Sequence, residues 1–141
     1  MSVVSVISPK PIFQIDGLEF LTLEGFYDHI SSRIGTGPFG NNLDAFNDIL
    51  RGGFGTPEGG FVLCWKNHGA SKQRLGYEET ARQLQKRLER CHPDNIAPVA
   101  TELSAALRRE GPTVFDWLVE IIMAHGPGGE EQEDGVELML Q

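Results

Sequence analysis

The chain has 141 residues, a length that predicts one domain able to bury a core without disulfides or a structural metal. Its composition, 40% hydrophobic and 23% charged, is that of a globular protein. The 20 acidic and 12 basic residues give a net charge of −8, which argues against binding along a nucleic acid backbone and favours a basic partner. No apolar run approaches the roughly 18–20 residues that span a bilayer, so we expect no membrane partner.

The two cysteines, Cys64 and Cys91, are too few for a disulfide framework, so we expect reduced thiols and a cytoplasmic protein. The apolar start, Met1–Ile7, has no preceding basic residue and is interrupted by serines, so we expect no signal peptide. Cys91 adjoins His92, but no second Cys/His pair has the spacing of a zinc finger. The other histidines are scattered along the chain: His29, His68 and His125. The sequence therefore predicts neither a metal site nor a cofactor.

Three apolar runs predict strands. Ile12–Ile15 ends at the turn dipeptide Asp16-Gly17. Phe61–Trp65 is almost continuously apolar, which is typical of a strand buried on both faces of a parallel sheet. Val136–Leu140 follows an acidic loop and would close the fold.

Three segments with apolar residues at helical spacing predict core helices. Their stripes are Leu23, Phe26 and Ile30; Leu43, Phe46 and Leu50; and Phe115, Leu118 and Ile122. Asn41 or Asn42 would cap the second helix, and Gly52-Gly53 would end it. Thr113 would cap the last helix, with Asp116 at the position of a capping-box acid.

Residues 72–111 differ in character, because they hold 8 of the 12 basic residues and only 6 of the 20 acids. Two further helical stripes flank a break at His92–Asn95. These stripes are Tyr77, Ala81, Leu84, Leu88 and Cys91, and Ile96, Val99, Leu103 and Leu107. The pattern predicts a helical hairpin with a basic outer face, inserted at 74–112.

The order of these elements is strand, helix, helix, strand, inserted helices, helix, strand. This alternation predicts an α/β fold with a small three-stranded parallel sheet packed with helices. We expect a single domain over 1–141 that contains the insertion 74–112.

Asp44 and Asp48 lie four residues apart on the second predicted helix, so both side chains project from one face. That face is offset from the apolar stripe, so the carboxylates should face solvent or a partner. Asp116 and Glu120 repeat the spacing on the last helix, and the two pairs could form one anionic surface. For each pair taken alone, an ordinary solvated face is the simpler interpretation.

The glycine-rich loop 52–60 does not match a phosphate-binding loop. It follows a helix rather than a strand, and it lacks both a third correctly spaced glycine and a Gly-Lys-Ser/Thr end. It is best interpreted as a connector, with Phe54 as a candidate contact residue at its tip.

The segment Phe39–Leu50 resembles the signature of the barstar family: an aromatic residue, Gly, any residue, Asn-Leu-Asp-Ala, two residues and an aspartate. Three further segments are similar to that family: Ile15–Gly17, Phe61–Lys66 and Ser71–Gln73. The last helix and strand fit the same plan. The resemblance covers most of 12–73 and 113–141 and leaves out the inserted hairpin.

The resemblance implies a small parallel sheet flanked by helices, and an intracellular inhibitor or immunity protein that binds a secreted barnase-like microbial ribonuclease 1:1. It implies neither enzymatic activity nor direct binding to nucleic acid. Asp48 matches the aspartate that enters the basic nuclease site, and Asp44 matches its neighbouring contact. The full implied contact set is Asp44, Asn47, Asp48, Gly52, Gly53, Phe54 and Glu120. Departures from the family pattern at Pro38, Asn47 and Ala124 favour a different cognate nuclease or weaker binding.

Two alternatives remain open from the sequence. In one, an acidic pair acts as a general acid/base or a metal site, although no histidine or basic residue lies in register to complete it. In the other, the chain is an interaction module with a non-nuclease target, bound through the basic insertion 74–112.

Overall fold

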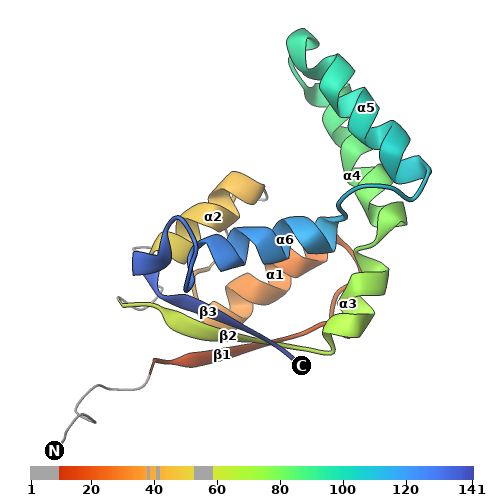
Figure 1. Cartoon of the computed structure of the whole chain (residues 1–141). Coiled ribbons are helices and arrows are strands. Elements are labelled where there is room, and N and C mark those ends of the chain that lie inside the picture. Colours follow the sequence, from red (N-terminus) through yellow and green to blue (C-terminus); the bar gives the residue numbers. More distant parts are fainter. Residues whose placement is uncertain (1–9, 38, 41, 53–58) are drawn as a thin grey trace, which may run out of the picture.

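The computed structural model describes residues 10–37, 39–40, 42–52 and 59–141 (Figure 1). The described elements are β1 (Ile12–Asp16), α1 (Leu23–Ile34), α2 (Leu43–Arg51), β2 (Phe61–Lys66), α3 (His68–Arg74), α4 (Tyr77–Arg90), η2 (Pro93–Asn95), α5 (Ile96–Leu107), α6 (Val114–Ala124), η3 (Gln132–Asp134) and β3 (Val136–Leu140). Within these ranges, no helix has the length and apolarity needed to cross a bilayer.

The three strands form one parallel sheet in the order β1-β2-β3, which confirms the predicted α/β fold. Helices α1, α2 and α6 cover one face of this sheet (Figure 1). The central strand β2 turns Phe61, Leu63 and Trp65 toward them, and all three side chains are buried. On the opposite face of β2, Cys64 is buried as predicted, but Val62 is only half-buried. Met139 of the edge strand β3 is 45% exposed.

An aromatic cluster fixes the helices on the sheet. The ring of Phe26 from α1 lies 5.4 Å from Trp65 and 5.3 Å from Phe46 of α2, between ring centroids. Trp65 also lies 5.2 Å from Phe115 of α6, and its indole N–H donates a 2.9 Å hydrogen bond to Ser71 Oγ. One tryptophan thus contacts three helices, and its only polar atom is satisfied.

Helix α3 was not predicted. Its sequence, His-Gly-Ala-Ser-Lys-Gln-Arg, has no apolar stripe, and Ser71 is its one buried residue. The helix follows Asn67, which has a left-handed φ of 54° and donates from its side-chain amide to Asp16 Oδ1 at 2.9 Å. Gly17 is required beside it, because a Cβ there would collide with the backbone oxygen of Asn67. Tertiary contacts, rather than a periodic apolar pattern, therefore determine where α3 forms.

The predicted hairpin is present as α4 and α5, which project from the body of the molecule (Figure 1). Its own small core contains Leu84, Val99 and Ala106. The prediction that Ile96 and Leu107 belong to this core is wrong, since they are 47% and 68% exposed. The contact between α4 and α5 buries fewer residues of the apolar stripe than the sequence pattern predicts, because α5 packs mainly against one neighbour, α4.

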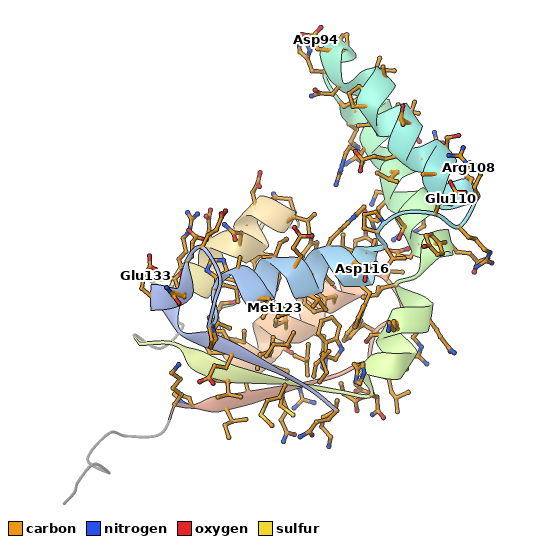
Figure 2. All side chains as sticks on the ribbon, in the orientation of Figure 1. Asp94, Arg108, Glu110, Asp116, Met123 and Glu133 are labelled. Carbon is orange, nitrogen blue, oxygen red and sulfur yellow. The ribbon has the colours of Figure 1, made fainter. Side chains whose placement is uncertain are left out.

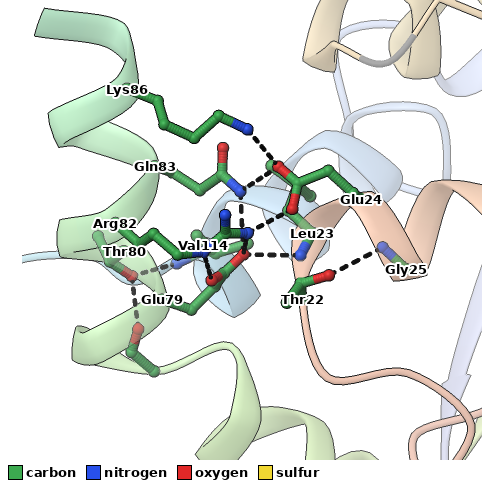
Figure 3. A network of polar contacts seen from close by, with 11 residues as sticks. Thr22, Leu23, Glu24, Gly25, Glu79, Thr80, Arg82, Gln83, Lys86 and Val114 are labelled. Atoms are coloured by element: carbon green, nitrogen blue, oxygen red, sulfur yellow. Dashed lines mark hydrogen bonds and ion pairs between the residues drawn. The ribbon is translucent and has the colours of Figure 1, made fainter.

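Polar contacts join the hairpin to the body (Figure 3). Glu79 of α4 is only 6% exposed and accepts a 2.8 Å hydrogen bond from the backbone N–H of Leu23 at the start of α1. The same carboxylate accepts hydrogen bonds from Arg82 and Gln83. Thr80 Oγ1 in turn accepts the backbone N–H of Val114 at 2.8 Å, which ties α4 to the first turn of α6.

Glu24 of α1 completes this network from the other side. Burial raises the pKa of its carboxyl, but hydrogen bonds from Gln83, Lys86 and Arg82 outweigh burial and lower the pKa to about 2. The ionised carboxylate is therefore the form that holds α4 against α1.

We expect Glu79→Ala to lower the free energy of unfolding by about 2 kcal/mol, because it leaves a buried backbone N–H and two side chains without their charged acceptor. Urea denaturation of the full chain measures this change. The matched control is Glu78→Ala, an exposed neighbour on the same helix, with an expected change below about 0.5 kcal/mol. Equal effects of the two substitutions would contradict the role given to Glu79.

The lowered pKa of Glu24 predicts a pH dependence of stability. Its folded pKa lies below the unfolded value of 4.5, so its contribution is present above that pH and is lost as the pH falls toward about 2. We expect the stability difference between the wild type and Glu24→Gln, measured by urea denaturation, to shrink over this window. A difference that stays constant from pH 7 to pH 2.5 would count against it.

Candidate functional site

Helix α2 presents its polar face outward because its apolar face is fixed in the core. Asn42 caps the helix, accepting a 2.7 Å hydrogen bond from Ala45 N–H through its side-chain oxygen. Phe46, Ile49 and Leu50 are buried. Asn42 is therefore the cap, whereas Asn41, the alternative, lies outside the described residues.

Asp44 and Asp48 are both exposed, as predicted. Within the described ranges, Asp44 makes no ion pair, and Asp48 has one contact, 3.5 Å from Arg51 Nη1 with both side chains about half exposed. Arg51 is held more closely by Glu131, at 2.8 Å. A surface pair with the geometry of Asp48 and Arg51 contributes little, so the carboxylate of Asp48 can be released to a partner at small cost.

Asn47 is half-buried and faces inward toward His125, the C-cap residue of α6. His125 is fully buried, with Nε2 2.7 Å from Asn47 Oδ1 and Nδ1 2.6 Å from Asp134 Oδ2. This chain of contacts joins α2, α6 and the turn η3. The sequence predicted Asn47 as a contact residue, but its side-chain oxygen is engaged within the protein.

Sequence reasoning missed His125, which lies 78 residues from Asn47. No spacing motif reports a contact over that distance.

His125, Glu131 and Asp134 also place ligand-type atoms within 4.8 Å of one another. Each of them already has a protein partner: Asn47 and Asp134 for the imidazole, and Arg51 for Glu131. The arrangement therefore supports a structural role, holding α2 to the end of α6.

Helix α6 packs beside α2 (Figure 1). It carries the predicted Glu120, which is exposed. Its expected companion, Asp116, lies at the start of α6 (Figure 2). The Asp116 carboxylate accepts hydrogen bonds from the backbone N–H and hydroxyl of Thr113, at 2.9 and 3.1 Å. The predicted capping box is confirmed. Of the two acids, Glu120 is the one whose carboxylate makes no hydrogen bond or ion pair within the described ranges.

The end of α2 is shaped by Gly52, which has a φ of 98° that favours glycine. The other two predicted contact residues of this connector, Gly53 and Phe54, lie outside the described residues.

We call the exposed acidic side of α2 the α2 face and define it by Asp44 and Asp48; Glu120 is exposed on the neighbouring helix α6. Asp44 and Asp48 are exposed carboxylates one helical turn apart, and the opposite side of their helix is packed in the core. Such a pair is suited to bind a cluster of cationic side chains. The chain as a whole has the negative charge that would attract such a partner.

A protein-family model described as Barstar (barnase inhibitor) matches residues 10–100. This range is more than half of the chain. It runs from β1 through α4 into α5 and contains all of α2. The match therefore includes much of the hairpin, which the resemblance seen in the sequence left out, and it ends before α6 and β3. Comparison with curated proteins gives no match.

We expect Asn47→Ala to lower the free energy of unfolding by about 1–2 kcal/mol, because it removes a partner from the fully buried imidazole of His125. Asp48→Ala, on the exposed side of the same helix, should change it by less than about 1 kcal/mol. Urea denaturation of both variants at pH 7 makes the comparison. Similar losses in the two variants would mean that the buried contact does not anchor α2.

Proposed function

Since this chain belongs to the barstar family, we propose that it is an intracellular inhibitor of a secreted barnase-like ribonuclease and blocks the enzyme with the α2 face. The observation that carries this proposal is the exposure of Asp44 and Asp48 on a helix that lies inside the matched range. The family description, barnase inhibitor, supplies the class of partner.

The proposed mechanism is electrostatic. A ribonuclease active site gathers cationic groups because it binds phosphate. In the complex, Asp48 occupies the place of a phosphate, and Asp44 and Glu120 contact basic residues at the margin. Carboxylates held on a rigid helix have little conformational freedom to lose on binding, which favours affinity. The negative net charge speeds the encounter, the effect for which the barnase–barstar pair is the reference case.

The proposal assigns the protein no catalytic role and one partner molecule per chain, because a single α2 face is presented. We further propose that it acts in the cytoplasm, where it protects the cell from the nuclease. Both cysteines are free thiols, which accords with a reducing compartment.

We expect Asp48→Ala to weaken binding to the ribonuclease by about 2–5 kcal/mol, because the desolvated cationic site of the enzyme would lose its counter-charge. Calorimetric titration into a small guanyl-preferring ribonuclease from the same source organism, at two salt concentrations, measures this loss. Wild-type binding should be 1:1 and weaker at high salt.

Asp94→Ala is the matched control, since it removes the same charge at the far tip of the hairpin (Figure 2). Its dissociation constant should stay close to that of the wild type. An unchanged dissociation constant for Asp48→Ala would remove Asp48 from the centre of the interface. Wild-type protein that binds no such enzyme would overturn the proposed function.

A further inference from the structure

A groove of about 510 Å³ lies where the hairpin meets the body. One wall is the start of α2, with Asn42 and Asp44, and the other is α4, with Lys86, Arg87 and Arg90. Asp44 therefore belongs to both the α2 face and the groove. A partner that contacts Asp44 would therefore reach the groove that α4 lines from the other side.

The three cationic side chains of α4 that line the groove differ in whether another group of the protein neutralises their charge. Lys86 Nζ lies 2.9 Å from Glu24 Oε2 and is neutralised in the network that joins α4 to α1 (Figure 3). The guanidinium of Arg87 stacks over the Trp117 ring, 5.3 Å from its centroid, which orients the charge without cancelling it. Arg90 is exposed and makes no ion pair within the described ranges. Two positive charges thus remain available on this wall.

Tyr27 of α1 also lines the groove. Its side chain is 2% exposed, and its hydroxyl has no hydrogen-bond partner among the described residues. Burial, together with the negative charges of Glu24 and Asp44, raises the pKa of Tyr27, so the hydroxyl keeps its proton and remains a donor. A buried donor without an acceptor is costly, and an acceptor entering the groove would remove that cost.

These charges constrain the kind of partner that fits. A ribonuclease that is basic over its whole contact surface would be attracted by Asp44 and Asp48 but repelled by Arg87 and Arg90. A complementary partner has cations opposite α2 and carboxylates opposite α4. Adjacent walls of opposite charge also fix the orientation of the partner and reject nucleases without the acidic segment.

We propose that the cationic wall of α4, with Arg87 and Arg90, is a second part of the nuclease-binding surface and takes an acidic segment of the same ribonuclease into the groove beside Asp44. This proposal rests on the proposed function. It makes the basic hairpin a specificity element of the inhibitor rather than a site for a separate target.

The experiment compares Arg90→Glu with Lys72→Glu by calorimetric titration into the ribonuclease at low and high salt. Lys72 is an exposed cation on α3, outside the groove, so its substitution makes the same change in net charge. We expect Arg90→Glu to weaken binding at least about tenfold at low salt, with a smaller effect at high salt, and Lys72→Glu to stay within about threefold of the wild type.

Asp48→Ala serves as the reference for the proposed function. If Asp48→Ala loses binding while Arg90→Glu matches Lys72→Glu or binds more tightly, the groove takes no acidic segment and the inference is overturned, although the inhibitor function stands. If the wild type binds no ribonuclease, both are overturned. Circular dichroism and urea denaturation of each variant confirm that the exposed substitutions leave the fold intact.

Tyr27→Phe tests the donor in the groove. Because its hydroxyl has no partner among the described residues, the substitution should leave the urea midpoint unchanged or raise it. Binding to the ribonuclease should weaken about threefold or more, the loss expected for one hydrogen bond. Unchanged binding would exclude the hydroxyl from the interface and overturn this part of the proposal.

Discussion

The burial of Phe46 between α2 and the aromatic cluster of the sheet is the contact on which the proposed binding surface depends. It fixes the rotation of α2 about its axis and so determines that Asp44 and Asp48, rather than apolar residues, face outward. An isolated helix of nine residues is barely stable in water, so α2 depends on its packing against the core for its stability. The charges of the α2 face are therefore positioned by the core beneath them.

A second constraint acts at the far end of α2. The contact of Asn47 with the fully buried His125, continued to Asp134, joins this helix to the end of α6 and to the turn before β3. Glu131 extends the connection to the surface through Arg51. The end of α2 that carries Asp48 is thus held from both sides, and this limits the conformational entropy that the helix would lose on binding a partner.

The features that follow local physical rules could be predicted from the sequence. Alternation of apolar runs and helical stripes predicted the sheet and its covering helices, and the offset of Asp44 and Asp48 from the stripe predicted their exposure. The features that depend on distant contacts were missed. Helix α3 has no stripe because its one buried residue, Ser71, bonds to a tryptophan on the adjoining strand. The partner of Asn47 lies far away in the sequence.

The hairpin meets the body of the fold around Trp117, which packs against both hydrophobic clusters while Arg87 stacks on its ring. The other tryptophan, Trp65, is sealed in the main core. The two tryptophans of the chain therefore lie in separate environments, one at the junction with the hairpin and one in the main core beside the sheet. We expect movement of the hairpin to change the emission of Trp117 more than that of Trp65, so the fluorescence of the wild-type protein can report on the hairpin without an added label.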